Sequence, residues 1–295
     1  MRPERFLIVT ADDFGLHEAV NEAVELASRV GTLCTASLMM GAAATEDAVR
    51  RARELPGLRV GLHLVLTDGS PVLPPEQISS LVDVHGRFRS RLFTDAARYF
   101  LSPRARRQLE AEIRSQFKAF AATGLPLDHV NAHKHFHIHP TVLTLMLRVG
   151  REFGLQAVRL PYEPAALLSE RTRTTLVDAL GAWGIKPWLQ LMKRRLQRAG
   201  VLCNDQLLGI HHSGAMNETT LLESLQRLPV GVTEIYLHPA TQSGASIAQS
   251  MSGYRHTDEL AALRSPRIRA ALAQMRATCG GYGDLVRLRS QRYAA

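Results

Sequence analysis

Short apolar runs alternate with amphipathic stretches along most of the chain. The runs at 5–11 (RFLIVTA) and 58–66 (LRVGLHLVL) are mostly apolar and too short for helices, which favours buried parallel strands. The segment 17–30 instead has apolar residues at helical spacing, and Gly31 suits the position just after a helix. Further strands are predicted at 33–39, 127–131, 156–160, 206–210 and 233–237. Further helices are predicted at 45–55 with Thr45 as N-cap, 95–100, 104–122, 140–153, 218–228 and most of 163–200, interrupted near Gly184 and Pro187.

The strand–helix alternation repeats about seven times, with no change of composition that would mark a linker. It predicts one α/β domain over 1–295, built on about seven parallel strands in an open sheet or a barrel, with a helical insertion around 163–200. The region 67–90 breaks the pattern with several prolines and glycines. A loop of this length in a compact domain is usually functional.

Composition and charge exclude several classes of protein. Apolar residues make up 45% of the 295 positions, which is too many for a disordered chain. No stretch of about 18 uninterrupted apolar residues is present, so the sequence predicts no membrane-spanning helix, and the first residues do not resemble a signal peptide. The 36 Lys and Arg against 27 Asp and Glu give a net charge of +9, but the basic residues are scattered and no nucleic-acid-binding motif accompanies them. We therefore expect no nucleic-acid partner.

The cysteines indicate a reducing compartment. Cys34, Cys203 and Cys279 lie far apart and form no CxxC pair, so they predict neither a disulfide framework nor a structural zinc site. The expected localisation is the cytoplasm.

Polar residues with metal or acid–base chemistry follow several predicted strands. Asp12 and Asp13 end the first strand, His63 lies near the end of the third, and His238 follows the last. The strand at 127–131 runs into four histidines, His133, His135, His137 and His139. Ligands of parallel α/β folds bind at the carboxyl ends of the strands, where these residues would meet.

Each of these residues also has a purely structural interpretation. Asp12 or Asp13 could cap the following helix, and His63, inside an apolar strand, could be a core histidine. A strand geometry could not aim all four members of the histidine cluster at one metal. The functional interpretation is one aspartate and two histidines around a divalent ion, with positions left for water and substrate. Zinc suits such ligands best, and Mg, Mn, Co or Ni is also compatible.

Three motifs, in this order, carry a family resemblance: 8–15 (IVTADDFG), 61–64 (GLHL) and 133–137 (HKHFH). Over nearly the whole chain the sequence resembles the YdjC-like carbohydrate deacetylases. The resemblance implies a distorted (β/α) barrel of the polysaccharide-deacetylase type, whose members use a divalent metal to remove acetyl from an N-acetylated sugar. By motif position it implies Asp13, His63 and His133 as metal ligands, Asp12 as base, His238 as general acid and Arg159 as the residue that orients the base.

The sequence departs from the family pattern at two places. Asn131 stands where many members have aspartate, and Lys134 stands where many have a further histidine. Neither replaces an implied ligand, but both lie close enough in sequence to alter the surroundings of the metal.

The loop around 66–88 resembles more narrowly the members associated with hopanoid biosynthesis. That implies the N-acetylglucosamine headgroup of a hopanoid glycolipid as substrate. Soluble chito-oligosaccharides are the alternative substrate, and a non-catalytic sugar- or lipid-binding protein on the same scaffold is the alternative function. A different hydrolase on this scaffold would use similar residues.

The segment 187–198 (PWLQLMKRRLQR) joins apolar residues to a basic flank, and Trp183 lies one turn upstream of it. One interpretation is an amphipathic helix packed on the barrel. The other is an interfacial helix on the inner face of an anionic membrane, with tryptophan at headgroup depth. The second would suit a substrate confined to a membrane.

Overall fold

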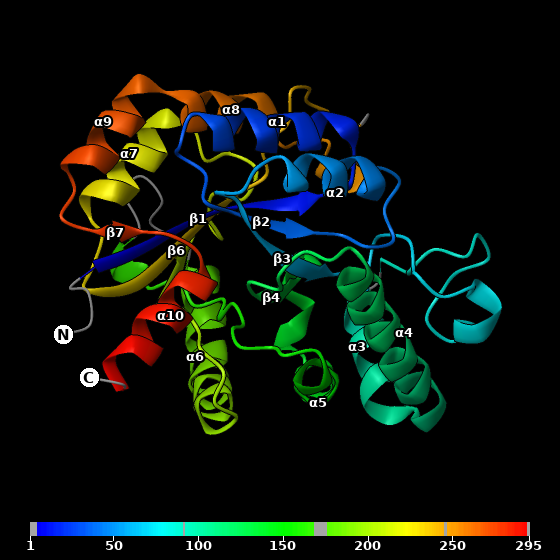
Figure 1. The fold of residues 1–295 in the computed structure, drawn as a ribbon. Coiled ribbons are helices and arrows are strands. Elements are labelled where there is room, and N and C mark those ends of the chain that lie inside the picture. The colour runs from blue at the N-terminus through cyan, green and yellow to red at the C-terminus, as the bar shows by residue number, and fades with distance from the viewer. Residues whose placement is uncertain (1–4, 91, 168–175, 245–246, 294–295) are drawn as a thin grey trace.

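The fold is organised around a curled parallel sheet with helices on both faces (Figure 1). The computed structural model describes residues 5–90, 92–167, 176–244 and 247–293. The strands run in the order β4-β3-β2-β1-β6-β5, all parallel, and β7 pairs with β1 outside this path. Their bounds are β1 Arg5–Phe14, β2 Thr35–Leu38, β3 Arg59–Leu64, β4 Val130–Ala132, β5 Gln206–Leu208, β6 Gly231–Leu237 and β7 Thr278–Cys279. The predicted α/β class and parallel sheet are confirmed.

The sheet curls toward closure between its two edge strands, β4 and β5. Single bridges join Val130 to Val158 and Ala157 to Leu202, and the Leu207 amide donates to the Tyr162 carbonyl at 2.8 Å. The prediction of a regular strand at 156–160 is therefore wrong. Consecutive residues there pair with different neighbours, so no continuous ladder forms. The result is a half-barrel.

Helices cover both faces of the sheet. In Figure 1, α1, α2, α7, α8 and α9 lie above it, α5, α6 and α10 lie below it, and α3 and α4 lie beyond β4. The α-helix bounds are α1 Glu18–Arg29, α2 Thr45–Arg53, α3 Leu92–Leu101, α4 Pro103–Ala122, α5 Pro140–Glu152, α6 Leu176–Arg198, α7 Glu218–Gln226, α8 His256–Arg264, α9 Pro266–Gln274 and α10 Tyr282–Tyr293. The short 3₁₀ helices are η1 Pro75–Ile78, η2 His133–Ile138, η3 Ala165–Leu167 and η5 Gln249–Met251. No described helix has the length and hydropathy needed to cross a bilayer.

Two helix predictions need correction. Thr45 is not the N-cap of α2, since Ala44 occupies that position and the Thr45 hydroxyl donates to the carbonyls of Met39 and Ala42, both at 2.8 Å. The expected interruption near Gly184 and Pro187 is also absent, because α6 continues through Pro187. Residues 168–175 of the predicted insertion lie outside the described part of the chain.

The region 67–90 is packed against the core. It contains η1 and an antiparallel bridge between Val82 and Phe88, and the side chains of Ile78, Leu81, Val82 and Phe88 are buried. The Tyr99 hydroxyl of α3 donates to the Leu66 carbonyl at 3.2 Å, just before this region begins. Burial of its own apolar side chains fixes this long loop in place.

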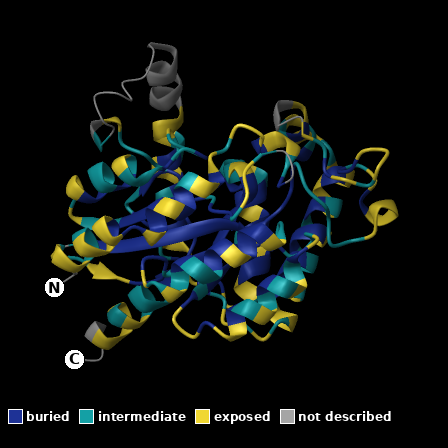
Figure 2. Cartoon of the chain, turned by 90° about the horizontal axis from the view of Figure 1, so that it is seen from above, coloured by how far each residue is buried: buried dark blue, intermediate teal, exposed yellow. Residues whose placement is uncertain are grey.

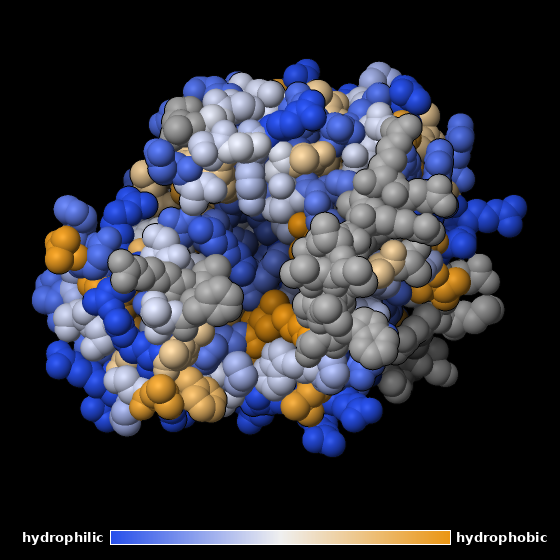
Figure 3. All heavy atoms as spheres, turned by 180° about the vertical axis from the view of Figure 1, so that it is seen from behind, coloured by the Kyte–Doolittle hydropathy of each residue, from blue (hydrophilic) through white to orange (hydrophobic). Residues whose placement is uncertain are grey.

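The two faces of the sheet pack against different sets of buried side chains, because successive residues of a strand point to opposite faces. On β1, Leu7 and Val9 join the main apolar core, whereas Phe6 and Ile8 form a smaller cluster inside the half-barrel. The buried residues follow the strands in Figure 2, and exposed residues lie on the outer sides of the helices. Above the small cluster the half-barrel interior becomes polar, with buried Thr10, Asp12, Ser37, His63, Asn131 and Glu234. Viewed from behind, the molecule is hollowed near its centre, and the hollow is mostly hydrophilic with a hydrophobic patch at its lower edge (Figure 3).

Candidate functional site

A bulge in β1 places two consecutive aspartates in the polar interior. The register with β2 passes from Ala11 opposite Ala36 to Phe14 opposite Leu38, so β1 holds one extra residue there. Asp13 takes a left-handed conformation with φ of 62°, which aspartate tolerates better than most residues. Regular alternation would send Asp12 and Asp13 to opposite faces. The bulge and the left-handed residue let both carboxylates, which are 2% exposed, reach one group of side chains.

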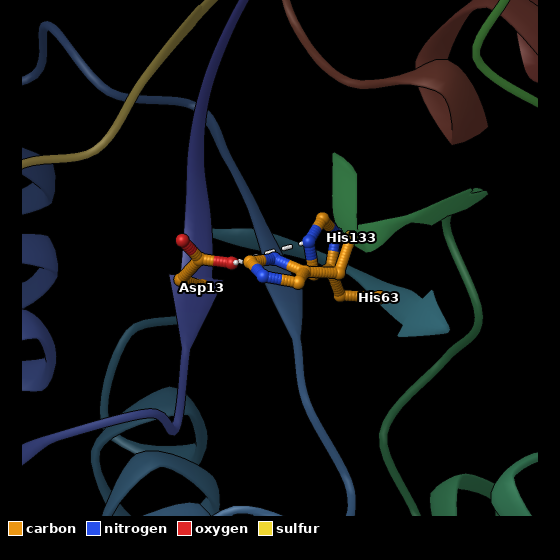
Figure 4. Close-up of side chains that lie close together, drawn as sticks. All are labelled: Asp13, His63 and His133. Carbon is orange, nitrogen blue, oxygen red and sulfur yellow. Dashed lines mark hydrogen bonds and ion pairs between the residues drawn. The ribbon is translucent and has the colours of Figure 1, made fainter. Parts of the chain in front are cut away.

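Asp13, His63 and His133 converge from β1, β3 and the end of β4 (Figure 4). The Asp13 Oδ1 atom lies 3.2 Å from His63 Nε2 and 3.0 Å from His133 Nδ1. One potential ligand atom from each residue lies within 4.8 Å of the others, and all three residues are buried. The second oxygen, Asp13 Oδ2, is buried with no hydrogen-bond partner among the described residues. The arrangement has the donor chemistry and the unfilled acceptor that a divalent cation requires.

The charges at this point also favour a cation. Burial works to lower the pKa of His133, but the Asp13 carboxylate outweighs it and raises that pKa to about 9. Burial likewise opposes ionisation of Asp13, while His133 and His63 hold its pKa well below the ordinary value. The ionised Asp13 carboxylate thus favours the protonated form of the buried His133 imidazole, which indicates a negative electrostatic potential at this point.

The backbone after β4 directs His133 to this point and sends the other histidines elsewhere. Lys134 and His135 both have positive φ, 53° and 54°, so the chain turns sharply instead of continuing as a strand. The strand geometry considered for the cluster is therefore wrong. His135 Nε2 lies 3.3 Å from the Tyr236 hydroxyl, His137 Nε2 donates to the Arg159 carbonyl at 2.9 Å, and His139 packs among aromatic rings.

Asn131 fixes the orientation of His63. Its Nδ2 lies 3.3 Å from Asp12 Oδ1, and a carboxylate can only accept, so the amide nitrogen must face Asp12. Asn131 Oδ1 then accepts from His63 Nδ1 at 2.6 Å, which puts the proton on Nδ1 and leaves the Nε2 lone pair facing Asp13. Such a tautomer is the one a metal ligand needs.

Arg159 holds Asp12 from the other side. Its guanidinium donates to both Asp12 oxygens, at 2.5 and 2.9 Å, and to both oxygens of Glu234, at 2.7 and 3.0 Å. Burial would raise the pKa of Asp12, but Arg159 outweighs it and holds that pKa below the ordinary value. The carboxylate is therefore ionised, oriented and buried.

His238 follows β6 and completes the group. Its Nε2 lies 3.9 Å from Asp13 Oδ2, and its Nδ1 has no hydrogen-bond partner among the described residues. The side chain is 11% exposed, more than those of Asp13, His63 and His133. Its backbone is clamped, because its amide donates to the Glu259 carboxylate and its carbonyl accepts from His256 Nδ1 at 2.6 Å. Burial lowers the pKa of His238, although Asp13 and Asp12 oppose this.

Three further side chains lie beside this group that the sequence patterns did not predict as site residues: Asp68, Glu234 and Ser37. Asp68 Oδ2 lies 4.0 Å from His133 Nε2 and accepts from Lys134 Nζ at 2.7 Å, which ties the start of the 67–90 loop to the site. The signal for Glu234 is an acidic residue inside the apolar strand at 233–237. Ser37 and Asp68 carry no comparable signal, since polar residues at such positions are common.

The chain is similar to known proteins over most of its length. The family model described as YdjC-like protein matches residues 6–274. The chain is 31% identical over 269 residues to a carbohydrate deacetylase of Brevibacillus brevis, covering 89% of this chain and 92% of the relative. It is also 31% identical over 287 residues to a chitooligosaccharide deacetylase of Serratia marcescens, covering 96% of this chain and 100% of the relative.

A solved structure supports the same assignment. A crystal structure from Enterococcus faecalis V583, of a protein named for cellobiose-phosphate cleavage, superposes with a TM-score of 0.72 at 26% identity, covering 95% of this chain and 98% of that one. Sequence and fold thus agree over most of the length: the chain belongs to the YdjC-like protein family.

Proposed function

We propose that the protein is a metal-dependent N-deacetylase of an acetylated amino sugar. The observation that carries this proposal is the convergence of Asp13, His63 and His133, with the Arg159-bound carboxylate of Asp12 directly before Asp13 in the chain. Relatives named carbohydrate deacetylase and chitooligosaccharide deacetylase support the reaction class.

The metal would be held by Asp13, His63 and His133. Their one oxygen and two nitrogen donors suit zinc and also admit Mg, Mn, Co or Ni. A divalent ion bound there would supply Lewis-acid chemistry, which polarises an amide carbonyl and lowers the pKa of a bound water to roughly 7.

Asp12 is the proposed general base. It is ionised and cannot rotate freely, because Arg159 binds both of its oxygens. Asn131 contacts the same carboxylate and also His63, so the base and the metal ligands share one rigid frame. We propose that Asp12 accepts the proton of the attacking water and that Arg159 keeps its carboxylate in place.

His238 is the proposed general acid. The departing sugar amine must leave protonated, and a histidine whose pKa is lowered by burial gives up a proton readily once it holds one. Replacing His238 by alanine should reduce kcat by about 10²–10⁴-fold while leaving the bound metal in place. Steady-state kinetics with metal analysis of the same sample test this. Full activity of the variant would exclude His238 as the general acid but would leave the proposed metal ligands unaffected.

The proposed substrate is the N-acetylglucosamine headgroup of a hopanoid glycolipid, with soluble chito-oligosaccharides as the competing substrate. The support for the glycolipid is the resemblance of the 66–88 loop, and the name of the Serratia marcescens relative supports the alternative. Acetate release from each compound by the metal-loaded full chain decides between them. Faster release from the glycolipid supports the first, release from the soluble sugars alone supports the second, and no release from either rejects the deacetylase proposal.

We further propose that α6 contacts an anionic membrane through its basic face. Its apolar residues Leu189, Met192 and Leu196 are buried on the barrel, and the Trp188 indole donates to the Ile138 carbonyl at 2.8 Å, so Trp188 is not free to enter lipid. The side chain of Trp183 lies outside the described residues. Basic side chains face solvent beside α6: four of the residues that line a groove of about 520 Å³ between α5 and α6 are arginines, Arg148, Arg151, Arg195 and Arg198.

Flotation with vesicles tests the membrane proposal. The chain should float with vesicles containing phosphatidylglycerol and not with neutral ones, and Arg194→Glu combined with Arg198→Glu should weaken flotation, since each basic residue near an anionic surface contributes about 1 kcal/mol. The matched control is Arg264→Glu combined with Arg269→Glu, on exposed positions of α8 and α9 on the other face of the sheet. Equal flotation with both kinds of vesicle would contradict it.

A further inference from the structure

The C-terminal helix α10 closes the end of the half-barrel opposite the proposed metal site. The strand β7, which precedes it, pairs with the start of β1 at Phe6 and Leu7. The Asp128 carboxylate then accepts the first amides of the helix, those of Tyr282 at 3.1 Å and Gly283 at 2.7 Å. Docking is close at Gly281, where an added Cβ would lie 2.8 Å from Asp128 Oδ1.

Tyr282 extends from this helix into the half-barrel. It is fully buried, packs with Phe6, Ile8 and Ala157, and lies against the His129 ring with 5.2 Å between ring centroids. Its hydroxyl reaches past this apolar cluster and donates to Glu234 Oε2 at 2.7 Å, with Asn204 Oδ1 as a second, more distant acceptor at 3.0 Å. The residue therefore spans from the apolar end of the half-barrel to its polar interior.

Glu234 links this hydroxyl to the proposed base. It competes with Asp12 for the guanidinium of Arg159, which donates to both carboxylates. Donors from Tyr282 and from the Thr10 hydroxyl, at 2.7 Å, satisfy the remaining acceptor capacity of Glu234. Without the Tyr282 hydroxyl, a buried carboxylate oxygen would lose a charge-assisted hydrogen bond, and Glu234 would draw Arg159 away from Asp12.

A second chain of hydrogen bonds runs from the same helix cap to the metal ligands. Asp128 Oδ2 lies 3.0 Å from His129 Nδ1, and His129 Nε2 lies 3.1 Å from the Ser37 hydroxyl. Asn131 Nδ2 donates to that hydroxyl at 2.9 Å, and Asn131 orients His63. Gly61 makes room for this chain, since an added Cβ would lie 2.4 Å from the His129 ring. The N-terminal end of α10 is thus connected through hydrogen bonds to the proposed base, Asp12, and to the proposed metal ligand His63.

We propose that Tyr282 is a positioning residue for Asp12, acting through Glu234 and Arg159. It lies beyond residues 6–274, the part of the chain that the family model matches, and it touches none of the proposed reacting groups. The proposal rests on the proposed deacetylase function for its kinetic consequence, but the orientation of Arg159 is a structural consequence that can be measured without activity.

The test is Tyr282→Phe in the full chain, which removes one hydroxyl and keeps the ring. We expect kcat for acetate release to fall about tenfold, with KM and bound metal unchanged. The matched control is Tyr99→Phe, which removes a buried hydroxyl that donates to the Leu66 carbonyl and has no link to Arg159. The control should retain the kcat of the parent chain.

A second measurement separates this proposal from the proposed function. The ¹⁵Nε–¹H signal of Arg159, assigned with Arg159→Lys, should shift in Tyr282→Phe and stay in place in Tyr99→Phe. If the parent chain releases no acetate, the proposed function fails while the NMR signal still tests the positioning role. An unmoved Arg159 signal, unchanged kcat, or equal losses in the two variants would overturn the proposal.

Discussion

Replacing Asp13 by alanine is expected to abolish divalent-metal binding and acetate release together. Asp13 supplies the only oxygen donor among the three proposed ligands, and its carboxylate lies within 3.2 Å of both histidine nitrogens. Without it the two imidazoles would face each other with no anion to offset a cation. Because loss of a mere neighbour of a ligand typically weakens metal affinity 10–100-fold, loss of the ligand itself should exceed about 100-fold. Metal analysis after dialysis, beside an acetate assay, measures both effects.

His133→Ala should reproduce this joint loss, since His133 faces the same Asp13 oxygen from the end of β4. The matched controls are Asp83→Ala and His85→Ala, which change the same residue types at exposed positions of the 67–90 loop. Both controls should bind metal normally. A variant of Asp13 that retained stoichiometric metal, or that kept its activity without metal, would contradict the assignment.

Asp12→Asn is expected to separate metal binding from turnover. Asparagine keeps the size of the side chain but loses the charge that accepts a proton, so kcat should fall by about 10²–10⁴-fold while the metal stays bound. The change also removes one anionic partner of the buried Arg159. Breaking a buried ion pair can cost about 3–5 kcal/mol, partly offset here because Glu234 still pairs with Arg159. The melting temperature should therefore fall, yet the variant should remain folded.

Kinetics, metal content and circular dichroism of one Asp12→Asn preparation test this expectation, with Asp83→Asn as the exposed control. Retained metal with greatly reduced turnover supports Asp12 as the base. Wild-type turnover would exclude that role, and loss of metal together with turnover would make Asp12 a ligand instead.

The sequence predicted most of the sheet because its strands are buried on both faces. Runs such as 5–11 and 58–66 are mostly apolar for that reason, and both appear as strands, β1 and β3. The carboxyl-end rule then placed Asp13, His63 and His133 on one edge, and the structure brings them together. The prediction is correct because the sheet curls. The curl brings His133, which follows β4, toward β1, although β2 and β3 lie between these strands.

What could not be predicted depends on contacts between distant segments. The bulge that turns Asp12 and Asp13 to the same group exists only in the register of β1 with β2. The left-handed turn at Lys134 and His135 has no glycine to mark it, so the histidine cluster reads as a strand from sequence. The links of Glu234 to Arg159 join positions 75 residues apart and arise only when the sheet curls.

The most direct test of the metal site is anomalous diffraction from crystals of the full chain loaded with zinc, with data collected on both sides of the zinc absorption edge. We expect one strong peak bounded by an Asp13 carboxylate oxygen, His63 Nε2 and His133 Nδ1, with His238 nearby. A peak elsewhere, with these three side chains still in direct contact around an empty site, would contradict the account.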